Sequence, residues 1–369
     1  PPRDSIRRQR QMCIRDRIID IAQFVGALAA LIIIHELGHF TAARLLGVEV
    51  EEFGLGFPPR AVTLFHAGGT RYSINWLPLG GFVRLKGENN PDVPGGFASA
   101  NPWTRFAILS AGPFANLLVG VLLYAIIFTQ IGRPVADQVQ VIEVAPNSPA
   151  EQAGLLPTDL ILQVNETEID STIALQEAIF DSLEETTVII LERGGETVEV
   201  TLVPRENPPQ GEGAIGIVMG NPTTPINLVS ALPMGAVAVY EHIVQLLQFP
   251  VRIIQGQISP EQGRLAGYKG MFDIYQQVQQ REALPGIPAG VNVLGFFATI
   301  TISFAVLNLL PIPALDGGRI TFLIPEIVLR RRIPPQYENV INLVSFGLLL
   351  MLLLYINIQD FVNPIQLPK

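Results

Sequence analysis

The stretch that decides the fold is residues 18–47, IIDIAQFVGALAALIIIHELGHFTAARLLG, in which an H-E-x-x-H motif lies inside an apolar run. The run exceeds the roughly 20 residues that a helix needs to cross a hydrocarbon core. Residues four apart lie on one helix face, so His35 and His39 can share a metal ion. Ionisable groups at bilayer depth cost at least about 2.5 kcal/mol each and need a partner. We therefore predict a zinc ion (Zn²⁺) here, with Glu36 as the general base.

Two histidines leave a zinc site one ligand short, and Asp316 is the only acid in the apolar segment 291–324. We predict it as the third ligand. It lies in NLLPIPALDGGRI, where Pro311 and Pro313 cannot continue helical hydrogen bonding. Freed backbone at membrane depth must face protein or a water-filled cavity. This unwound strip, with Pro311, is expected to pair with an extended substrate backbone.

The whole chain has the composition of a polytopic α-helical membrane protein. It is 49% hydrophobic and only 15% charged, against about 25% charged in soluble domains. About four transmembrane helices are predicted, in residues 18–47, 104–131, 291–324 and 339–358. Residues 226–256 contain Glu241 and His242, which favours a helix lying in the membrane interface over a fifth crossing. We expect residues 226–286 to form this interfacial helix and a linker.

Basic residues set the expected topology. Arg330, Arg331 and Arg332 form one cluster, and six more Lys or Arg lie between the first two crossings. Such residues mark the cytoplasmic side, so residues 132–225 and both termini are expected outside. Residues 1–17 carry six Arg, contradict this placement and are interpreted as a non-native or disordered leader. Cys13 is given no function.

Residues 132–225 have a different composition, with sixteen acidic and three basic residues, and predict a small α/β domain. The order of expected strands and helices, with the phrase SPAEQAGLLPTDLILQVNETEI, resembles a PDZ domain over residues 132–220. Two interpretations stay open. The domain is either a spacer without a ligand, or a gate whose groove captures a peptide C-terminus.

Residues 54–85 alternate apolar and polar side chains around Gly-Gly signals and predict a β-hairpin inserted in the first half of the membrane core, residues 18–131. His66 falls at its tip and is interpreted as solvated, and His242 as interfacial. The second half of the core is expected at residues 287–369.

HELGH, GPFAN and NLLPIPALDGG together resemble the site-2 protease family, the intramembrane zinc metalloproteases. The resemblance runs from residue 18 onward and is strongest to bacterial members that act in sigma-E regulation, with one PDZ domain instead of two. It implies that His35, His39 and Asp316 bind zinc, that Glu36 is the base, and that Asn308 binds the substrate backbone or the oxyanion. Asn116 is either a substrate-side support of the site or a buried Asn that bonds another helix.

The same resemblance implies the bacterial inner (plasma) membrane and a membrane-associated β-structure at residues 54–85 whose edge can add a substrate strand. It also implies transmembrane substrates such as anti-sigma factors or signal-peptide remnants. The lipid bilayer is an expected partner, and nucleic acid is not. A catalytically inactive membrane PDZ receptor or quality-control protein is the alternative, although such a protein has no need of Glu36.

Overall fold

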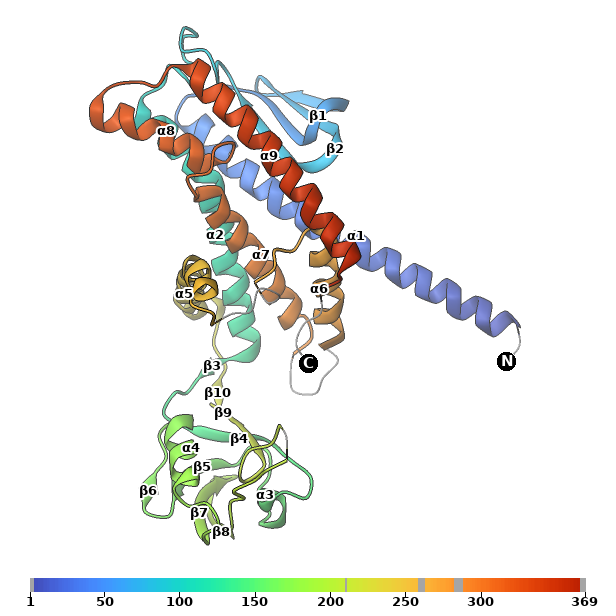
Figure 1. Cartoon of the computed structure of the whole chain (residues 1–369), viewed down its shortest axis with the longest axis vertical. Helices are drawn as coiled ribbons and strands as arrows, with labels where there is room; N and C mark the ends of the chain where they lie inside the picture. Colours follow the sequence, from blue (N-terminus) through green and yellow to red (C-terminus); the bar gives the residue numbers. More distant parts are fainter. Residues whose placement is uncertain (1–2, 210, 258–262, 282–287, 366–369) are drawn as a thin grey trace. The chain divides into compact units, whose positions relative to one another are not determined.

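The computed structural model describes residues 3–209, 211–257, 263–281 and 288–365, which fall into two units (Figure 1). Unit 1 comprises residues 1–127 and 228–369, and unit 2 comprises residues 128–227. The insertion of unit 2 into the membrane part agrees with the change in composition near residue 132.

Unit 1 is built from seven helices and one hairpin among the described residues. The elements before unit 2 are α1 (Arg3–Leu45), β1 (Val50–Ala67), β2 (Thr70–Leu85) and α2 (Pro102–Ile131). Those after it are α5 (Leu228–Ile254), α6 (Tyr268–Arg281), α7 (Val291–Leu309), α8 (Asp316–Leu329) and α9 (Pro335–Val362). Residues 3–17 continue α1, and their interpretation as a separate leader stays a prediction.

Five of the described helices are long and apolar enough to cross a membrane: Arg17–Leu45 of α1, α2, α5, α7 and Gln336–Val362 of α9. The chain is therefore a membrane protein with one more candidate span than the four expected. The additional one is α5. Figure 1 shows α5 almost end-on where α2 and α7 run along the picture, so α5 crosses these helices instead of running beside them. This orientation favours the interfacial interpretation of residues 226–256.

The third apolar segment is not one continuous helix. α7 ends at Leu309, residues 310–315 are non-helical, and α8 begins at Asp316. The break predicted from the prolines is present. A Cβ on Gly317 would lie 2.2 Å from the Leu310 carbonyl oxygen, so the loop can fold back over the first turn of α8 only because this residue is glycine.

The segment expected to form a β-hairpin does so, over longer strands. Residues Glu52 to Leu55 pair on both sides, with 71–74 and with 81–84, because both long strands double back. The result is four adjacent segments in the order 60–67, 70–77, 50–57 and 81–85, so residues 81–85 form one edge of the sheet. The rings of Phe53 and Tyr72 in this sheet contact the ring of Phe40 in α1.

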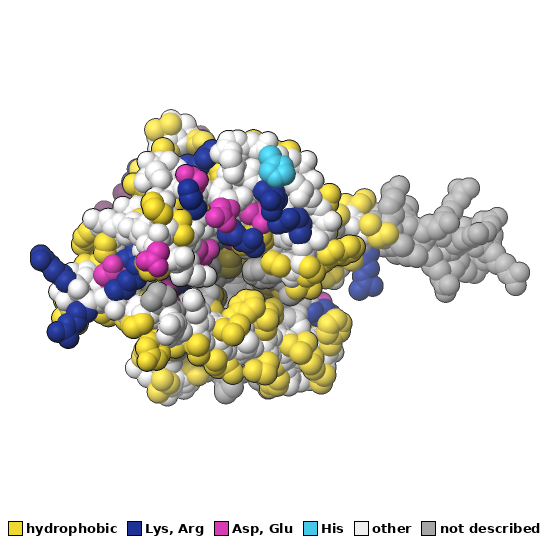
Figure 2. Space-filling view, turned by 90° about the horizontal axis from the view of Figure 1, so that it is seen from above, with side chains coloured by type: hydrophobic (Ala, Val, Ile, Leu, Met, Phe, Trp, Pro, Cys, Tyr) yellow, Lys and Arg dark blue, Asp and Glu magenta, His cyan; other side chains and the backbone are white. Residues whose placement is uncertain are grey.

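One apolar core ties these elements together. It joins α1, β1, β2, α2 and α8 through Ala43, Val48, Val50, Leu85, Phe97, Ile108, Leu109 and Leu323. Figure 2 looks onto the end of the molecule that carries β1, β2 and α8, where Lys and Arg side chains gather among acidic ones and border a broad apolar surface. This end is the one expected to face the cytoplasm.

Unit 2 contains the mixed α/β elements expected from its sequence. Its sheet has the antiparallel order β8-β7-β5-β4-β9, with β6 beside β5 and a separate β3–β10 pair. The strands are β3 (Arg133–Pro134), β4 (Val139–Val144), β5 (Leu160–Val164), β6 (Thr167–Glu168), β7 (Thr187–Arg193), β8 (Glu196–Leu202), β9 (Ile217–Gly220) and β10 (Thr223–Thr224). Two helices, α3 (Pro149–Gln152) and α4 (Thr172–Phe180), are capped by the Ser148 and Ser171 side chains.

Candidate metal centre

α1 places two imidazoles on one side of the helix. His35 and His39 are one turn apart and only 4% and 8% exposed, and their Nε2 atoms lie 3.2 Å from each other. The spacing follows from the helix alone, since residues i and i+4 lie one above the other. The first part of the predicted site therefore needs no tertiary contact to form.

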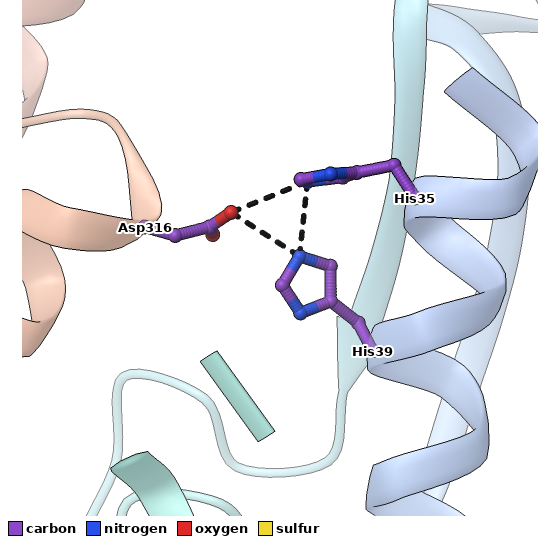
Figure 3. Close-up of side chains that lie close together, drawn as sticks. All are labelled: His35, His39 and Asp316. Atoms are coloured by element: carbon purple, nitrogen blue, oxygen red, sulfur yellow. Dashed lines mark hydrogen bonds and ion pairs between the residues drawn. The ribbon is translucent and has the colours of Figure 1, made fainter. Parts of the chain in front are cut away.

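The third group comes from a segment 277 positions after His39 in the chain. Asp316 Oδ2 lies 3.2 Å from His35 Nε2 and 3.3 Å from His39 Nε2, as Figure 3 shows. The carboxylate stands on the first residue of α8, where a helix N-terminus favours negative charge. The three residues that sequence predicts as ligands are thus brought together in the structure.

The three donor atoms have the spacing that zinc requires. A tetrahedral ion with ligands at about 2.0–2.2 Å separates its donor atoms by about 3.3–3.5 Å. The distances here are 3.2, 3.2 and 3.3 Å. Asp316 Oδ2 is buried, and the described residues offer it no hydrogen-bond donor in good geometry. Such a group is costly unless a cation pairs with it, so the residues fit a divalent metal with two imidazoles and one carboxylate.

α2 orients one of the imidazoles. The Nδ1–H of His39 donates to the Ile108 carbonyl oxygen at 2.8 Å, which leaves the Nε2 lone pair directed at the cluster. Metal-binding histidines commonly have such a partner on the second nitrogen. Gly38 and Gly112 allow the helices to approach, because a Cβ on Gly112 would lie 2.3 Å from His39 Nε2. No sequence pattern could point to Ile108, since a backbone carbonyl can come from any residue type.

A cavity of about 470 Å³ opens beside the cluster. Among its lining residues are all three candidate ligands, Glu36 and Asn308. Asn308 is 8% exposed, and its Nδ2 donates to the Phe304 carbonyl oxygen at 3.0 Å. Two other predicted site residues, Asn116 and Pro311, are not among the described residues that line this cavity. Asn116 is fully buried next to His35 and Pro311 is exposed, and their substrate-binding role stays a prediction.

The β-sheet edge forms one wall of the same cavity. Residues 80–85 of β2 line it. A Cβ on Gly81 would lie 2.8 Å from Glu36 Cγ and 3.2 Å from Ile32 Cγ2, so this edge runs directly against the candidate base. Because residues 81–85 end the sheet, the edge is available for pairing with another strand.

Two polar contacts that sequence reasoning missed hold the Asp316 loop. Asn342 of α9 accepts a hydrogen bond from Ala314 N–H at 3.0 Å, and Ala314 has a φ of +76°. Arg319, one turn after Asp316, donates to Glu88 at 2.6 Å. Arg319 is the only basic residue of segment 291–324, and this isolated charge could have indicated that it pairs with an acidic residue. No sequence pattern could indicate the Asn342 contact, because it depends on how α9 packs.

Comparisons with known proteins agree with this geometry. The family model described as peptidase family M50 matches residues 23–352. Two similar relatives, from Rhizobium meliloti and Campylobacter jejuni, bear names that place them among the zinc metalloproteases. They are 30% and 31% identical over 362 residues, which cover 91% and 93% of this chain and 94% and 93% of theirs. The "Metalloprotease MmpA" of Caulobacter vibrioides is 28% identical over 361 residues, covering 87% of this chain and 90% of its own.

One solved structure is similar to part of the chain. The PDZ domain of the SdrC-like protein of Listeria monocytogenes is 22% identical and covers 23% of this chain and 90% of its own, with a TM-score of 0.21. The match to the family model includes the HELGH and LDGG motifs of this chain, and the relatives cover about nine tenths of its length. The chain therefore belongs to peptidase family M50, the site-2 proteases, a family of zinc metalloproteases.

Proposed function

We propose that this chain is an intramembrane zinc metalloendopeptidase that hydrolyses peptide bonds within transmembrane segments of other membrane proteins. The observation that carries the proposal is the buried group of His35, His39 and Asp316, beside a cavity, on helices apolar enough to cross a membrane. A zinc ion held by these three residues would supply Lewis acidity and lower the pKa of a water towards about 7.

The chain's own residues supply the proton transfers. Glu36 lines the cavity on the same helix as the two imidazoles, without being one of the grouped ligands. In the proposed reaction it takes a proton from the attacking water and passes it to the leaving amine. Asn308, which also lines the cavity, binds the substrate backbone or the oxyanion that develops on the scissile carbonyl.

The sheet edge at residues 81–85 supplies the means of holding a substrate. A transmembrane helix uses its carbonyls in its own hydrogen bonds, so a scissile segment must unwind before attack. Pairing with an exposed strand edge replaces the lost backbone bonds. Gly81 lets this edge lie against Glu36, so a strand added there would run past the base.

Localisation and partners follow from the same proposal. The expected location is a bacterial inner membrane, with unit 2 outside and anti-sigma factors or signal-peptide remnants as substrates.

Unit 2 has a cavity of about 250 Å³ lined by α4 and residues 213–219, including Leu175, Ile179, Ala214, Ile215 and Ile217. Its apolar lining suits the side chains of a peptide C-terminus, the partner expected of a PDZ-like groove.

The deciding experiment compares the full chain with Glu36→Gln and His35→Ala in detergent, measuring zinc content and cleavage of a transmembrane reporter. We expect Glu36→Gln to retain zinc and to cleave about 10²- to 10⁴-fold more slowly. His35→Ala should lose both zinc and cleavage. Undiminished cleavage by Glu36→Gln would overturn the proteolytic mechanism and favour a non-catalytic membrane receptor.

A further inference from the structure

Asn116 is a buried polar residue that the proposed reaction does not use. It lies on α2, is 0% exposed, and its side-chain Nδ2 is 3.4 Å from His35 Nδ1. Its Oδ1 is buried and has no hydrogen-bond partner among the described residues. A buried amide oxygen without a partner costs about 1–3 kcal/mol. The position therefore calls for an explanation.

The protonation that zinc demands of His35 provides one. A metal that binds His35 through Nε2 requires the proton on Nδ1, and that N–H then needs an acceptor. An amide nitrogen cannot accept a hydrogen bond. The oxygen and nitrogen of an Asn side chain exchange positions by a half-turn about the last bond, and their assignment follows from the surrounding network. With Oδ1 in the place of Nδ2, His35 gains its acceptor and Oδ1 gains a donor, while Nδ2 takes the position for which the described residues offer no partner.

The matching arrangement at His39 supports this orientation. Its Nδ1–H donates to the carbonyl oxygen of Ile108, also on α2. His35 precedes His39 on α1, whereas Asn116 follows Ile108 on α2. The two contacts are therefore ordered as in a pair of antiparallel helices. α2 would thus supply one acceptor to each imidazole, a backbone oxygen to His39 and a side-chain oxygen to His35.

Bonding to another helix does not account for the side chain. Thr301 of α7 donates to Asn116, but to its backbone carbonyl oxygen at 3.2 Å, a contact that any residue could accept. That bond fixes the backbone of α2 at this point and leaves the amide free to face His35.

From this geometry we infer that Asn116 is a positioning residue, whose side-chain oxygen accepts the Nδ1–H of His35 and keeps the Nε2 lone pair directed at the metal. The inference rests on the proposed zinc site. It differs from the expectation that Asn116 contacts substrate, and Asn116 is not among the described residues that line the cavity.

Zinc affinity tests the inference independently of proteolysis. The full chain with Glu36→Gln, which prevents turnover, is the parent, and zinc binding is measured by competition with a chelator in detergent. Loss of an outer partner of a metal-binding His weakens affinity about 10- to 100-fold. We expect this loss in Asn116→Leu and also in Asn116→Ala. The alanine variant adds no bulk, so it tests the inference even if the leucine variant fails to fold. Asn116→Asp keeps an acceptor and should bind zinc nearly as tightly as the parent.

Two controls separate the outcomes. Ser110→Ala removes a buried hydroxyl of the same helix, for which the described residues offer no hydrogen-bond partner, and should leave zinc affinity unchanged. His35→Ala removes a proposed ligand and shows how far zinc affinity falls when the ligand itself is lost. If His35→Ala binds zinc as the parent does, the proposed metal site fails. If His35→Ala loses zinc while Asn116→Ala keeps the parent's affinity, or Asn116→Asp falls as far as Asn116→Ala, the positioning role alone is overturned.

Discussion

Asp159 of unit 2 and Asp316 of unit 1 are two aspartates whose carboxylates have opposite surroundings. In unit 2, Asp159 is 1% exposed and accepts hydrogen bonds from Arg193 at 2.7 and 2.5 Å and from Leu156 N–H at 2.8 Å. In unit 1, Asp316 Oδ2 faces two imidazole nitrogens, and the part of the chain that the structure describes offers it no donor in good geometry. The carboxylate in unit 2 is paired by its own domain, whereas the one in unit 1 is left for a ligand.

The two surroundings distinguish a buried charge that stabilises the fold from one that is available to bind a ligand. A buried ion that is paired and hydrogen-bonded holds its fold together, and removing one partner costs stability. A buried carboxylate without such partners makes the fold less stable, so it marks a candidate site for a cation. The guanidinium of Arg193 illustrates the first case, because its hydrogen bond to Asp159 raises its pKa above the ordinary value.

The largest expected effect is on Asp316. Asp316→Asn should abolish detectable zinc binding and reduce cleavage of a transmembrane reporter by more than about 10³-fold, because a charged ligand is lost from a three-ligand site. The metal-free variant should unfold at a temperature no lower than the metal-free parent. Thermal unfolding with and without chelator measures this. A destabilised metal-free variant would show that Asp316 is structural, as Asp159 is.

The next effect concerns the space beside Glu36. Gly81→Ala places a methyl group 2.8 Å from Glu36 Cγ, closer than two carbon atoms normally approach, and should displace the base or the sheet edge. A misplacement of about 1 Å at a reacting group costs up to about 10²-fold in rate, so we expect cleavage to fall about 10- to 100-fold with zinc retained. Gly347→Ala, where a Cβ meets nothing within 4 Å, is the control. Equal cleavage by both variants would contradict the close approach of the edge to the base.

A smaller effect, on stability alone, is expected in unit 2. Asp159→Asn removes the charge that Arg193 and Leu156 N–H contact, and should destabilise this unit by about 2 kcal/mol. Hydrogen exchange of residues 139–202 in the full chain measures the loss. Zinc content and the exchange of α1 should not change. A loss of zinc in this variant would break the distinction between the two aspartates.

The smallest effect is a pH dependence in the hairpin. Burial raises the pKa of Glu52, but hydrogen bonds from Arg60 and Ser73 and the charges of Arg60 and Arg84 outweigh it, so the pKa lies below its ordinary value of 4.5. A carboxylate with a lowered folded-state pKa stabilises the fold above the unfolded pKa, and this contribution is lost as the pH falls through the folded pKa.

We therefore expect the protection of residues 50–85 from hydrogen exchange to fall below about pH 4.5 in the wild type. Glu52→Gln should be less protected at neutral pH and depend less on pH, while Glu49→Gln, at an exposed ion pair, should behave as the wild type. An unchanged pH profile in Glu52→Gln would assign the acid sensitivity to other groups.

Several parts of this molecule could be predicted from local patterns because their causes are local. The helix and strand order of unit 2 follows from alternation and turn residues, including Gly194 and Gly195 between β7 and β8, with φ of +61° and +88°. The break after α7 follows from proline chemistry. The extent of the sheet was not predictable, since the double pairing of residues 52–55 depends on how two long strands bend.

Local sequence was enough to show that two imidazoles share one face of an apolar helix, and that Asp316 is the one acid of its apolar segment able to join them. The spacing of four and the cost of an unpaired charge in lipid are sufficient reasons. The 3.2 and 3.3 Å approach of Asp316, the Ile108 carbonyl on His39, the Asn342 contact at Ala314 and the sheet edge beside Glu36 came from the folded structure alone. These contacts join segments far apart in the chain, and their distances depend on helix packing, which no local pattern encodes.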